Sequence, residues 1–535
     1  MELKRLDQED LEIILGTLKE FAEREMPLEK RLKWDREDVC PSDVVRTMLS
    51  EDVGLHLVFI PAEYDGMGGG AYDVYRLSCE FAKIDLGVAT SMLAVALGTD
   101  PIRVGCTHEQ KQVWMTRIAN EGLIVAYGVT EPEAGSNVEN LKTKADRICD
   151  AAGNVTHYKL NGVKQFISNG AIADLYTILA KTEGGPTFFV VERNTPGLSP
   201  GKQEEKHGIR LSNTSQVILE DVVIPAANIV GTKEGDGIKQ SNEVFGFTRL
   251  MVAAFGLGCG LSALEKAIAY SKERKAFGTY LCEKQGYTHK LLVPHSVRLA
   301  AAQAYIEYVA TLLDSSETDR QVEGSVAKLF ATEAGNAAAE AAIQAFGGYG
   351  YCAEYEVEKI KRDTRILTIY EGTSEIQQNI IGVFRMRENV KAKGGFYNGL
   401  ADRVAGLEKA NGHLVAKAAR FLSECTIAAF HGKLTRQQHG VFELALAMAD
   451  VETAVALCEA AALDGSDLKL AQARVWAAEV ARGVPTRLLK LFAGAGLYDT
   501  AKIAALTETA DLPSVIAAQA GVVADMNLIA RKITE

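Results

Sequence analysis

The sequence predicts an α+β protein that is mostly helical, and two observations carry this prediction. The chain has 535 residues, 47% of them hydrophobic and only 12 of them proline, which is typical of a long, well-buried helical protein. Apolar residues recur at helical spacing along most of it, but between Gly122 and Ile238 short runs alternate apolar and polar residues, as strands do. We therefore predict four regions: an N-terminal helical domain (1–122), a middle β domain (123–238), a C-terminal helical domain (239–390) and a helical extension (391–535).

The first region is expected to contain helices at 7–32, 42–50, 72–84, 87–98 and 108–121, with Ser42 as an N-cap. Between them lies the Gly-rich segment Ile60 to Gly70. It lacks the lysine and the spacing of a phosphate-binding P-loop, so we expect a structural turn there.

The β region contains a loop that could bind a ligand, YGVTEPEAGSN, from Tyr127 to Asn137. Its small residues, threonine hydroxyl and amides could hold an anionic, planar cofactor, although similar loops often only turn the chain.

Helical periodicity returns from Ser241 to Arg387, interrupted by glycines and arginines that suit a phosphate ligand. The guanidinium of Arg274 could bind a pyrophosphate through two bonds, and Gly347 and Gly348 could offer their amides to the same group. Arg249 could contact a ligand or form an ordinary ion pair.

One carboxylate, Glu371, stands in a setting that suits a base. It follows the mostly apolar run Ile366 to Tyr370 and precedes Gly372, whose backbone can approach a ligand closely. If this carboxylate is buried, its pKa rises toward the range useful for proton abstraction. Thr373 is expected to cap a helix over Ser374 to Phe384; an ordinary loop with a helix cap is the alternative.

Beyond a predicted linker at Lys391 to Gly399, the extension is Ala-rich, and we expect a helical bundle that covers the catalytic domain or a subunit interface. Its helical patterns lie near 400–411, 413–430, 438–463, 467–481, 484–494 and 513–532.

Bulk properties narrow the function classes. A net charge of −12 argues against nucleic acid as a main partner. The nine cysteines are scattered singly, so neither a disulfide framework nor a zinc site is indicated. The first residues show neither a secretory nor a transit peptide, and no apolar run reaches membrane-spanning length, so we expect a cytoplasmic protein.

Five segments together resemble signatures of the acyl-CoA dehydrogenases over residues 1–388: YGVTEPEAGSN, KQFISNG (Lys164 to Gly170), RKAFGTYL (Arg274 to Leu281), QAFGGYGY (Gln344 to Tyr351) and RDTRILTIYEGTSEIQ, which begins at Arg362. The resemblance implies that family's fold, with a four-helix bundle in the C-terminal domain, and FAD as cofactor. The extension is similar to that of the longer family members, so a homodimer or a homotetramer is expected.

The resemblance also implies roles for individual residues. Glu371 would remove the α-proton of an acyl-CoA, Thr130 would face the flavin pyrimidine edge, Phe166 would pack on the ring system, and Ser168 would bond near flavin N5. The implied FAD-binding residues are Tyr127, Val129, Thr130, Gly135, Ser136, Phe166, Ile167, Ser168, Arg274, Phe277, Gln285, Gln344, Gly347, Gly348, Thr373 and Glu375, and the substrate-binding residues are Ser136, Arg249, Glu371 and Gly372. Departures from the family pattern are Asn137 for Asp, Phe166 for Trp and Ser168 for Thr; the last two keep an aromatic face and a hydroxyl.

The implied reaction converts an acyl-CoA to its 2,3-enoyl product, as in fatty acid β-oxidation, with electrons passing from FAD to an electron-transfer flavoprotein. Two alternatives stay open: an acyl-CoA oxidase, and a non-catalytic flavin-binding protein of the stress-response kind. Ala89 stands where the glutaryl-CoA enzymes have an arginine, which favours a neutral acyl chain.

Overall fold

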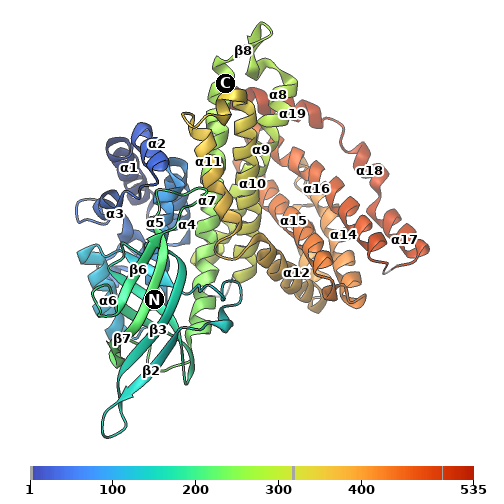
Figure 1. Cartoon of the computed structure of the whole chain (residues 1–535). Helices are drawn as coiled ribbons and strands as arrows, with labels where there is room; N and C mark the ends of the chain where they lie inside the picture. The colour runs from blue at the N-terminus through green and yellow to red at the C-terminus, as the bar shows by residue number, and fades with distance from the viewer. Residues whose placement is uncertain (1–3, 316–319, 497) are drawn as a thin grey trace. The chain divides into compact units, whose positions relative to one another are not determined.

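The computed structural model describes residues 4–315, 320–496 and 498–535. The chain divides into two compact units, the first formed by Met1–Met251 with Ala310–Asp319 and the second by Val252–Val309 with Arg320–Glu535 (Figure 1). The first unit contains N-terminal helices and a β-sheet, and the second is built almost entirely of helices.

The N-terminal helices are α1 (Gln8–Glu25), α2 (Leu28–Glu37), α3 (Ser42–Met48), α4 (Ala71–Ile84), α5 (Leu86–Gly105) and α6 (His108–Glu121), with 3-10 turns at Leu55–Phe59 and Ala62–Tyr64. The single helix expected at 7–32 is two helices, because Pro27 lies between them and cannot continue a helix. Ser42 is the first residue of α3, not its cap; Pro41 holds that position. All residues of α5 from Leu86 to Ile102 are buried, so this helix forms the core of the N-terminal region.

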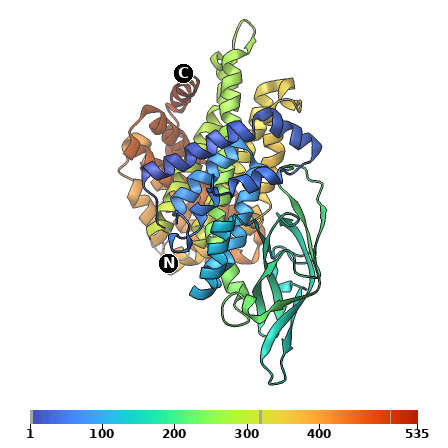
Figure 2. The same cartoon turned by 90° about the vertical axis from the view of Figure 1, so that its left-hand side faces the viewer.

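The sheet has the strand order β1-β4-β2-β3-β7-β6, and β5 also pairs with β4. Its strands are β1 (Val125–Gly128), β2 (Lys144–Cys149), β3 (Val155–Ser168), β4 (Leu175–Thr182), β5 (Gly185–Glu192), β6 (Leu198–Gln203) and β7 (Thr214–Pro225). Most neighbours are antiparallel, as expected, but β2 pairs with β4 in parallel at Lys144 and Lys181, and β1 pairs with β4 in parallel along its whole length. The long segment between these two strands, which contains the β2–β3 hairpin, provides the crossover that a parallel pair requires (Figure 2).

Long helices dominate the second unit. They comprise α7 (Gly237–Glu273, whose first part belongs to the first unit), α8 (Gln285–Leu291), α9 (Val293–Ser315, whose last part belongs to the first unit), α10 (Gln321–Phe346), α11 (Glu356–Thr364) and α12 (Ser374–Lys391), with a small hairpin of β8 (Lys275–Ala276) and β9 (Thr279–Tyr280). Helix α10 packs against both α11 and α12. Ser325 to Thr332 of α10 are all buried, so the centre of this unit lies along α10.

The extension continues the same helical unit without a break. Its helices are α13 (Gly395–Val404), α14 (Gly412–His431), α15 (Gln438–Asp464), α16 (Asp467–Gly494), α17 (Thr500–Ala510), α18 (Leu512–Ala517) and α19 (Val522–Thr534). The linker predicted at Lys391 to Gly399 is wrong, because α12 reaches Lys391 and α13 begins at Gly395. The two helices expected at 467–481 and 484–494 are one, since α16 runs through Pro485, which is buried.

Among the described residues, one helix is long and apolar enough to cross a membrane: α7, whose apolar window is 93% buried inside the protein. Helices α17 and α18, together with α19, pass the same test only as a pair bent by 58°.

Candidate active site

Glu371 lies in a backbone turn between a 3-10 helix (Arg365–Thr368) and α12. Both Glu371 (φ 53°) and Gly372 (φ 88°) are in the left-handed region. Glycine adopts this conformation at no steric cost, but for glutamate it costs about 1–2 kcal/mol. As predicted, Thr373 caps α12, its hydroxyl accepting a bond from the Ile376 N–H (3.4 Å). The turn therefore presents a half-buried carboxylate at the start of a long helix.

Side chains hold the carbonyl oxygens of this turn. Gln377 Nε2 donates to the Glu371 and Gly372 carbonyls, at 3.0 Å each. Lys328 Nζ, from α10, donates to the Gly372 carbonyl at 2.7 Å. Ser374, the first residue of α12, donates its hydroxyl to the carboxylate of Glu333 on α10 (2.7 Å). The turn is thus fixed from α10 and from the first turns of α12.

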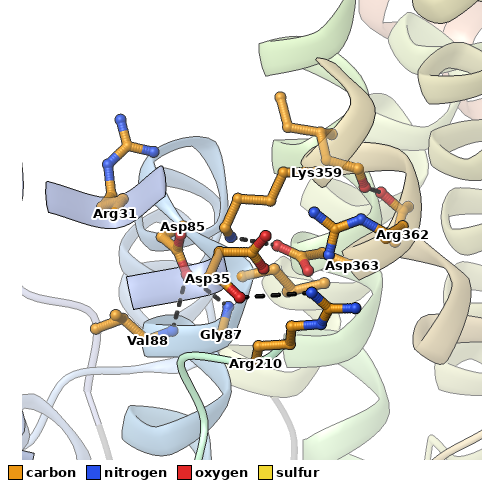
Figure 3. A network of polar contacts seen from close by, with 12 residues as sticks. Arg31, Asp35, Asp85, Gly87, Val88, Arg210, Lys359, Arg362 and Asp363 are labelled. Atoms are coloured by element: carbon orange, nitrogen blue, oxygen red, sulfur yellow. Dashed lines mark hydrogen bonds and ion pairs between the residues drawn. The ribbon is translucent and has the colours of Figure 1, made fainter. Parts of the chain in front are cut away.

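Two ion pairs order the helix α11 that precedes the turn. Arg362 Nη2 bonds Glu358 Oε2 at 3.0 Å, and Lys359 Nζ bonds Asp363 Oδ2 at 2.6 Å (Figure 3). Lys359 and Asp363 are both buried. Arg362 and Asp363, the first two residues of the sequence motif, therefore stabilise α11 through bonds to Glu358 and Lys359 of the same helix.

Figure 3 also draws residues of the first unit, where Asp85 caps α5. Its carboxylate accepts bonds from the N–H groups of Gly87 (2.8 Å) and Val88 (3.1 Å). The cap fixes the first turn of α5, which carries the fully buried Ala89.

In the first unit, the loop after β1 is bonded to the end of β3. The Thr130 carbonyl accepts a bond from the Gln165 N–H (2.9 Å), and Lys164 Nζ donates to the Val129 carbonyl (3.2 Å). Lys164 also forms a buried ion pair with Glu131 (2.7 Å). Burial would raise the pKa of Glu131, but the ammonium of Lys164 and the N–H groups of Lys142 and Thr143, which donate to the carboxylate, hold that pKa below its usual range. The loop that carries Thr130 is therefore held by the bonds of an ionised Glu131.

Phe166 lies at an irregularity in β3, where the pairing with β7 shifts register between Lys164 and Ile167. Its φ is 59° and its side chain is 64% exposed. An aromatic residue in the left-handed region is unusual for a strand. Two residues later, Ser168 ends the strand, paired with Thr214 of β7.

The second unit contains a pocket of about 460 Å³ that is lined in part by Arg274. Residues from α7, the segment after it, α8 and the end of α10 line it, among them Arg274, Gln344, Gly347 and Gly348. A Cβ added at either glycine would meet nothing within 4 Å, so their backbone faces open space. A guanidinium, an amide and two bare backbone segments suit an anionic group such as a pyrophosphate.

Two further residues lie near this pocket in the chain. Phe277 is in a left-handed turn (φ 50°) with its ring 99% exposed. Gln285 Nε2 donates to Asn527 Oδ1 at 2.9 Å, which brings α19 of the extension against α8.

The predicted site residues thus divide between the units. The first unit carries Tyr127, Val129, Thr130, Gly135, Ser136, Phe166, Ile167, Ser168 and the buried Arg249, and the second carries Arg274, Phe277, Gln285, Gln344, Gly347, Gly348, Glu371, Gly372, Thr373 and Glu375. Within the units the structure brings together Thr130 with the Phe166 segment, and Arg274 with the two glycines.

Sequence reasoning missed four residues that hold these segments: Glu131, Lys164, Lys328 and Gln377. Glu131, Lys164 and Gln377 fall inside the motifs quoted above. For Lys328 the signal was a single lysine among the mostly small and apolar residues Gly324 to Ala331.

Comparison with known proteins identifies the class. Sequence models of the acyl-CoA dehydrogenase N-terminal, middle and C-terminal domains match residues 8–122, 126–222 and 235–384. An acryloyl-CoA reductase (NADH) of Anaerotignum propionicum is 35% identical over 388 residues, 71% of this chain and 96% of that protein. The chain belongs to the acyl-CoA dehydrogenase family.

Solved structures agree with this assignment. Butyryl-CoA dehydrogenase of Megasphaera elsdenii matches 71% of this chain and 98% of its own at 31% identity and a TM-score of 0.66. An acyl-CoA dehydrogenase from Bacillus anthracis, solved in complex with FAD, matches 99% of this chain and 95% of its own at 24% identity and a TM-score of 0.85. This second likeness concerns the fold alone, and it includes the extension. The predicted fold class is confirmed.

The cofactor of this flavin-dependent family is FAD, and the residues present fit it. The exposed ring of Phe166 beside the bonded Thr130 loop suits a flat ring system, and the pocket at Arg274 suits a pyrophosphate.

Proposed function

We propose that this flavin-dependent dehydrogenase oxidises the α,β bond of an acyl-CoA thioester, with Glu371 as the group that accepts the α-proton. The observation that carries the proposal is the turn at Glu371: a half-buried carboxylate in a left-handed conformation, next to a glycine and held by side-chain bonds to its carbonyls. Strained backbone of this kind is concentrated at functional sites.

The chain's own residues would divide the work as follows. Glu371 takes the α-proton, and its backbone N–H is assigned to the thioester oxygen, where negative charge develops as the proton leaves. One such donor contributes on the order of 3 kcal/mol to lowering the barrier. Bound FAD supplies the hydride acceptor, its N5. Phe166, Thr130 and Ser168 would hold the flavin ring, and Arg274 with Gly347 and Gly348 would hold a pyrophosphate.

For the substrate, we propose a neutral acyl chain. Ala89 is fully buried among apolar residues of α5 and offers no charge that could pair with a second carboxylate. Ser136 and Arg249 are assigned to the thioester and CoA portions. Electron-transfer flavoprotein is the proposed electron acceptor. The protein itself is proposed to be cytoplasmic and to form a homodimer or a homotetramer.

A second candidate is the same chemistry in reverse, the reduction of an enoyl-CoA. It is favoured by the 35% identity to the acryloyl-CoA reductase. Glu371 would then return a proton to the α-carbon.

Anaerobic mixing of the flavin-loaded protein with acyl-CoAs from butyryl to palmitoyl, and with branched and aromatic ones, tests the proposal. Bleaching of the flavin absorbance by one class is expected, and Glu371→Gln should abolish it while flavin stays bound. Glu340→Gln, a change of the same type at an exposed carboxylate of α10, should bleach like the unmodified protein. Rapid oxygen consumption with an acyl-CoA would instead indicate an oxidase, and no bleaching by any acyl-CoA would contradict the proposal.

A further inference from the structure

The turn that carries Glu371 is not a conformation the chain adopts by itself. Two consecutive residues, Glu371 and Gly372, have positive φ. Only the second is a glycine, so the conformation of the first must be imposed by its surroundings. The direction of the Glu371 side chain follows from that backbone conformation. Whatever fixes the turn therefore fixes where the Glu371 side chain leaves the backbone and in which direction it starts.

Two buried side chains fix it from opposite directions in the sequence. Gln377 reaches back from the first turns of α12 to the carbonyls of Glu371 and Gly372, and Lys328 reaches from α10 to the carbonyl of Gly372. Both side chains are 0% exposed. The Gly372 carbonyl thus receives two donors, one of them a buried amine.

The placement of Gln377 is costly for stability. Its Oε1 is buried and has no hydrogen-bond partner in the part of the chain that the structure describes. A buried acceptor without a partner is destabilising, and an apolar residue at this position would avoid that cost. The amide is therefore explained by its two bonds to the turn.

Gly372 fits this arrangement closely. A Cβ added there would lie 2.6 Å from Gln377 Nε2, so any larger residue would displace the amide from the carbonyls. Helix α10 bonds the segment around the turn at two more points. The Glu333 carboxylate accepts a hydrogen bond from the Ser374 hydroxyl, and Asn336 Nδ2 donates to the Thr364 carbonyl at 2.9 Å. Lys328 is thus one of several residues of α10 that form hydrogen bonds to the segment around the turn.

We propose that Lys328 and Gln377 are positioning residues for the reaction: they clamp the Glu371–Gly372 turn so that the carboxylate is held in place for proton transfer. This inference rests on the proposed role of Glu371. Neither residue is assigned contact with the substrate, so their loss acts on the chemical step rather than on binding.

Lys328→Met and Gln377→Met remove the donors while nearly preserving side-chain length. Each is expected to lower the anaerobic rate of flavin reduction by about 10- to 100-fold, with KM for the acyl-CoA changed less than about threefold and flavin content unchanged. Because both residues hold the same carbonyl, the double variant should lose less than the product of the two single losses. Amide hydrogen exchange over residues 370–376 should accelerate in both single variants.

Thr332→Val is the matched control: it removes a buried hydroxyl of α10 whose bonds among the described residues stay within the helix, to the carbonyls of Lys328 and Leu329. It should leave the reduction rate and the exchange at the turn unchanged. If Lys328→Met does not fold, Gln377→Met, which removes no charge, provides the test. Reduction rates within twofold of the unmodified protein in the folded methionine variants, with unchanged exchange, would overturn the clamp while the proposed function stands. If none of the acyl-CoAs reduces the flavin of the unmodified protein, the proposed function fails. The positioning role then fails with it, even if faster hydrogen exchange in the variants shows that the two residues hold the turn.

Discussion

The two ends of α12 are both held by buried polar side chains, but the two sets do different work. At the start of the helix, Lys328 and Gln377 bond backbone carbonyls of a strained turn. Toward its end, Arg385 enters a buried cluster of side chains around Glu452 of α15, with Nε–Oε1 at 2.9 Å and Nη2–Oε2 at 3.1 Å. The first set fixes the position of one carboxylate; the second joins the extension to the rest of the helical unit.

The cluster at the end of α12 is fully satisfied. Tyr305 and Tyr397 donate their hydroxyls to Glu452, at 2.7 and 3.3 Å. Burial, and then the neighbouring Glu452 carboxylate, raises the pKa of both tyrosines well above the ordinary value, so both remain donors. Arg385 also pairs with Glu323 of α10 (3.2 Å). The start of α12 thus carries the proposed positioning of Glu371, and the cluster near its end contributes to stability.

The largest effect is expected from Glu452→Ala, which leaves a buried arginine and two buried hydroxyls without their main partner. It should lower the free energy of unfolding by about 3–5 kcal/mol, measured by urea denaturation. Glu459→Ala, which removes a half-exposed pair with Arg403, should cost about 0–1 kcal/mol. If Glu452→Ala abolished flavin reduction while remaining as stable as the unmodified protein, the division of labour along α12 would be wrong.

A smaller loss of stability is expected at the buried ion pair of Lys164 and Glu131, where the cation is a lysine and not an arginine. Burial lowers the pKa of Lys164 to about 8, although Glu131 opposes this shift. Lys164 can therefore lose its proton when Glu131 is neutralised, as Arg385 cannot. Glu131→Gln should cost about 2 kcal/mol in urea denaturation and weaken FAD retention, because the Thr130 loop loses its support. A loss as large as that of Glu452→Ala would argue against this difference.

A pH dependence is expected from Glu234, which bonds Arg147 of β2 and Tyr158 of β3. The bond from Arg147, together with donors such as Tyr158, lowers the pKa of Glu234 to about 2 from 4.5. Because the folded pKa is the lower one, the stability from this carboxylate is full above pH 4.5 and is lost as pH falls toward 2. Glu234→Gln should cost about 1–2 kcal/mol at pH 7. Its difference from the unmodified protein in thermal denaturation should shrink between pH 4.5 and 2, and a constant difference would refute the assignment.

The smallest effect is expected from Thr373→Ala, which removes the cap of α12 beside the turn. It should cost about 1 kcal/mol in urea denaturation. Because Lys328 and Gln377 still hold the carbonyls, flavin reduction should slow less than in Gln377→Met. An equal or larger loss of rate would assign the positioning of Glu371 to the cap instead.

The sequence predicted the start of α12 better than its end, for a physical reason. Glu371, Gly372 and Thr373 are adjacent, and a glycine followed by a capping residue has local consequences that can be predicted without tertiary structure. Lys328 is 44 residues from Gly372, and Glu452 is 67 residues from Arg385, so their contacts exist only once the helices pack. The fold class followed from periodicity, while the predicted linker failed because Gly394 caps α13 and its other two glycines, Gly395 and Gly399, lie within that helix. The domain boundaries and the FAD contacts of individual residues stay predictions.

The most direct test of the central claim isolates the proton transfer at Glu371. With 3,3-dimethylbutyryl-CoA, whose β-carbon carries no hydrogen, the protein can remove an α-proton but no hydride can follow. In D₂O, the flavin-loaded protein is predicted to exchange the α-hydrogens for deuterium, detected by mass spectrometry, and Glu371→Gln to exchange them at least a thousandfold more slowly. Exchange by Glu371→Gln at the rate of the unmodified protein would contradict the account.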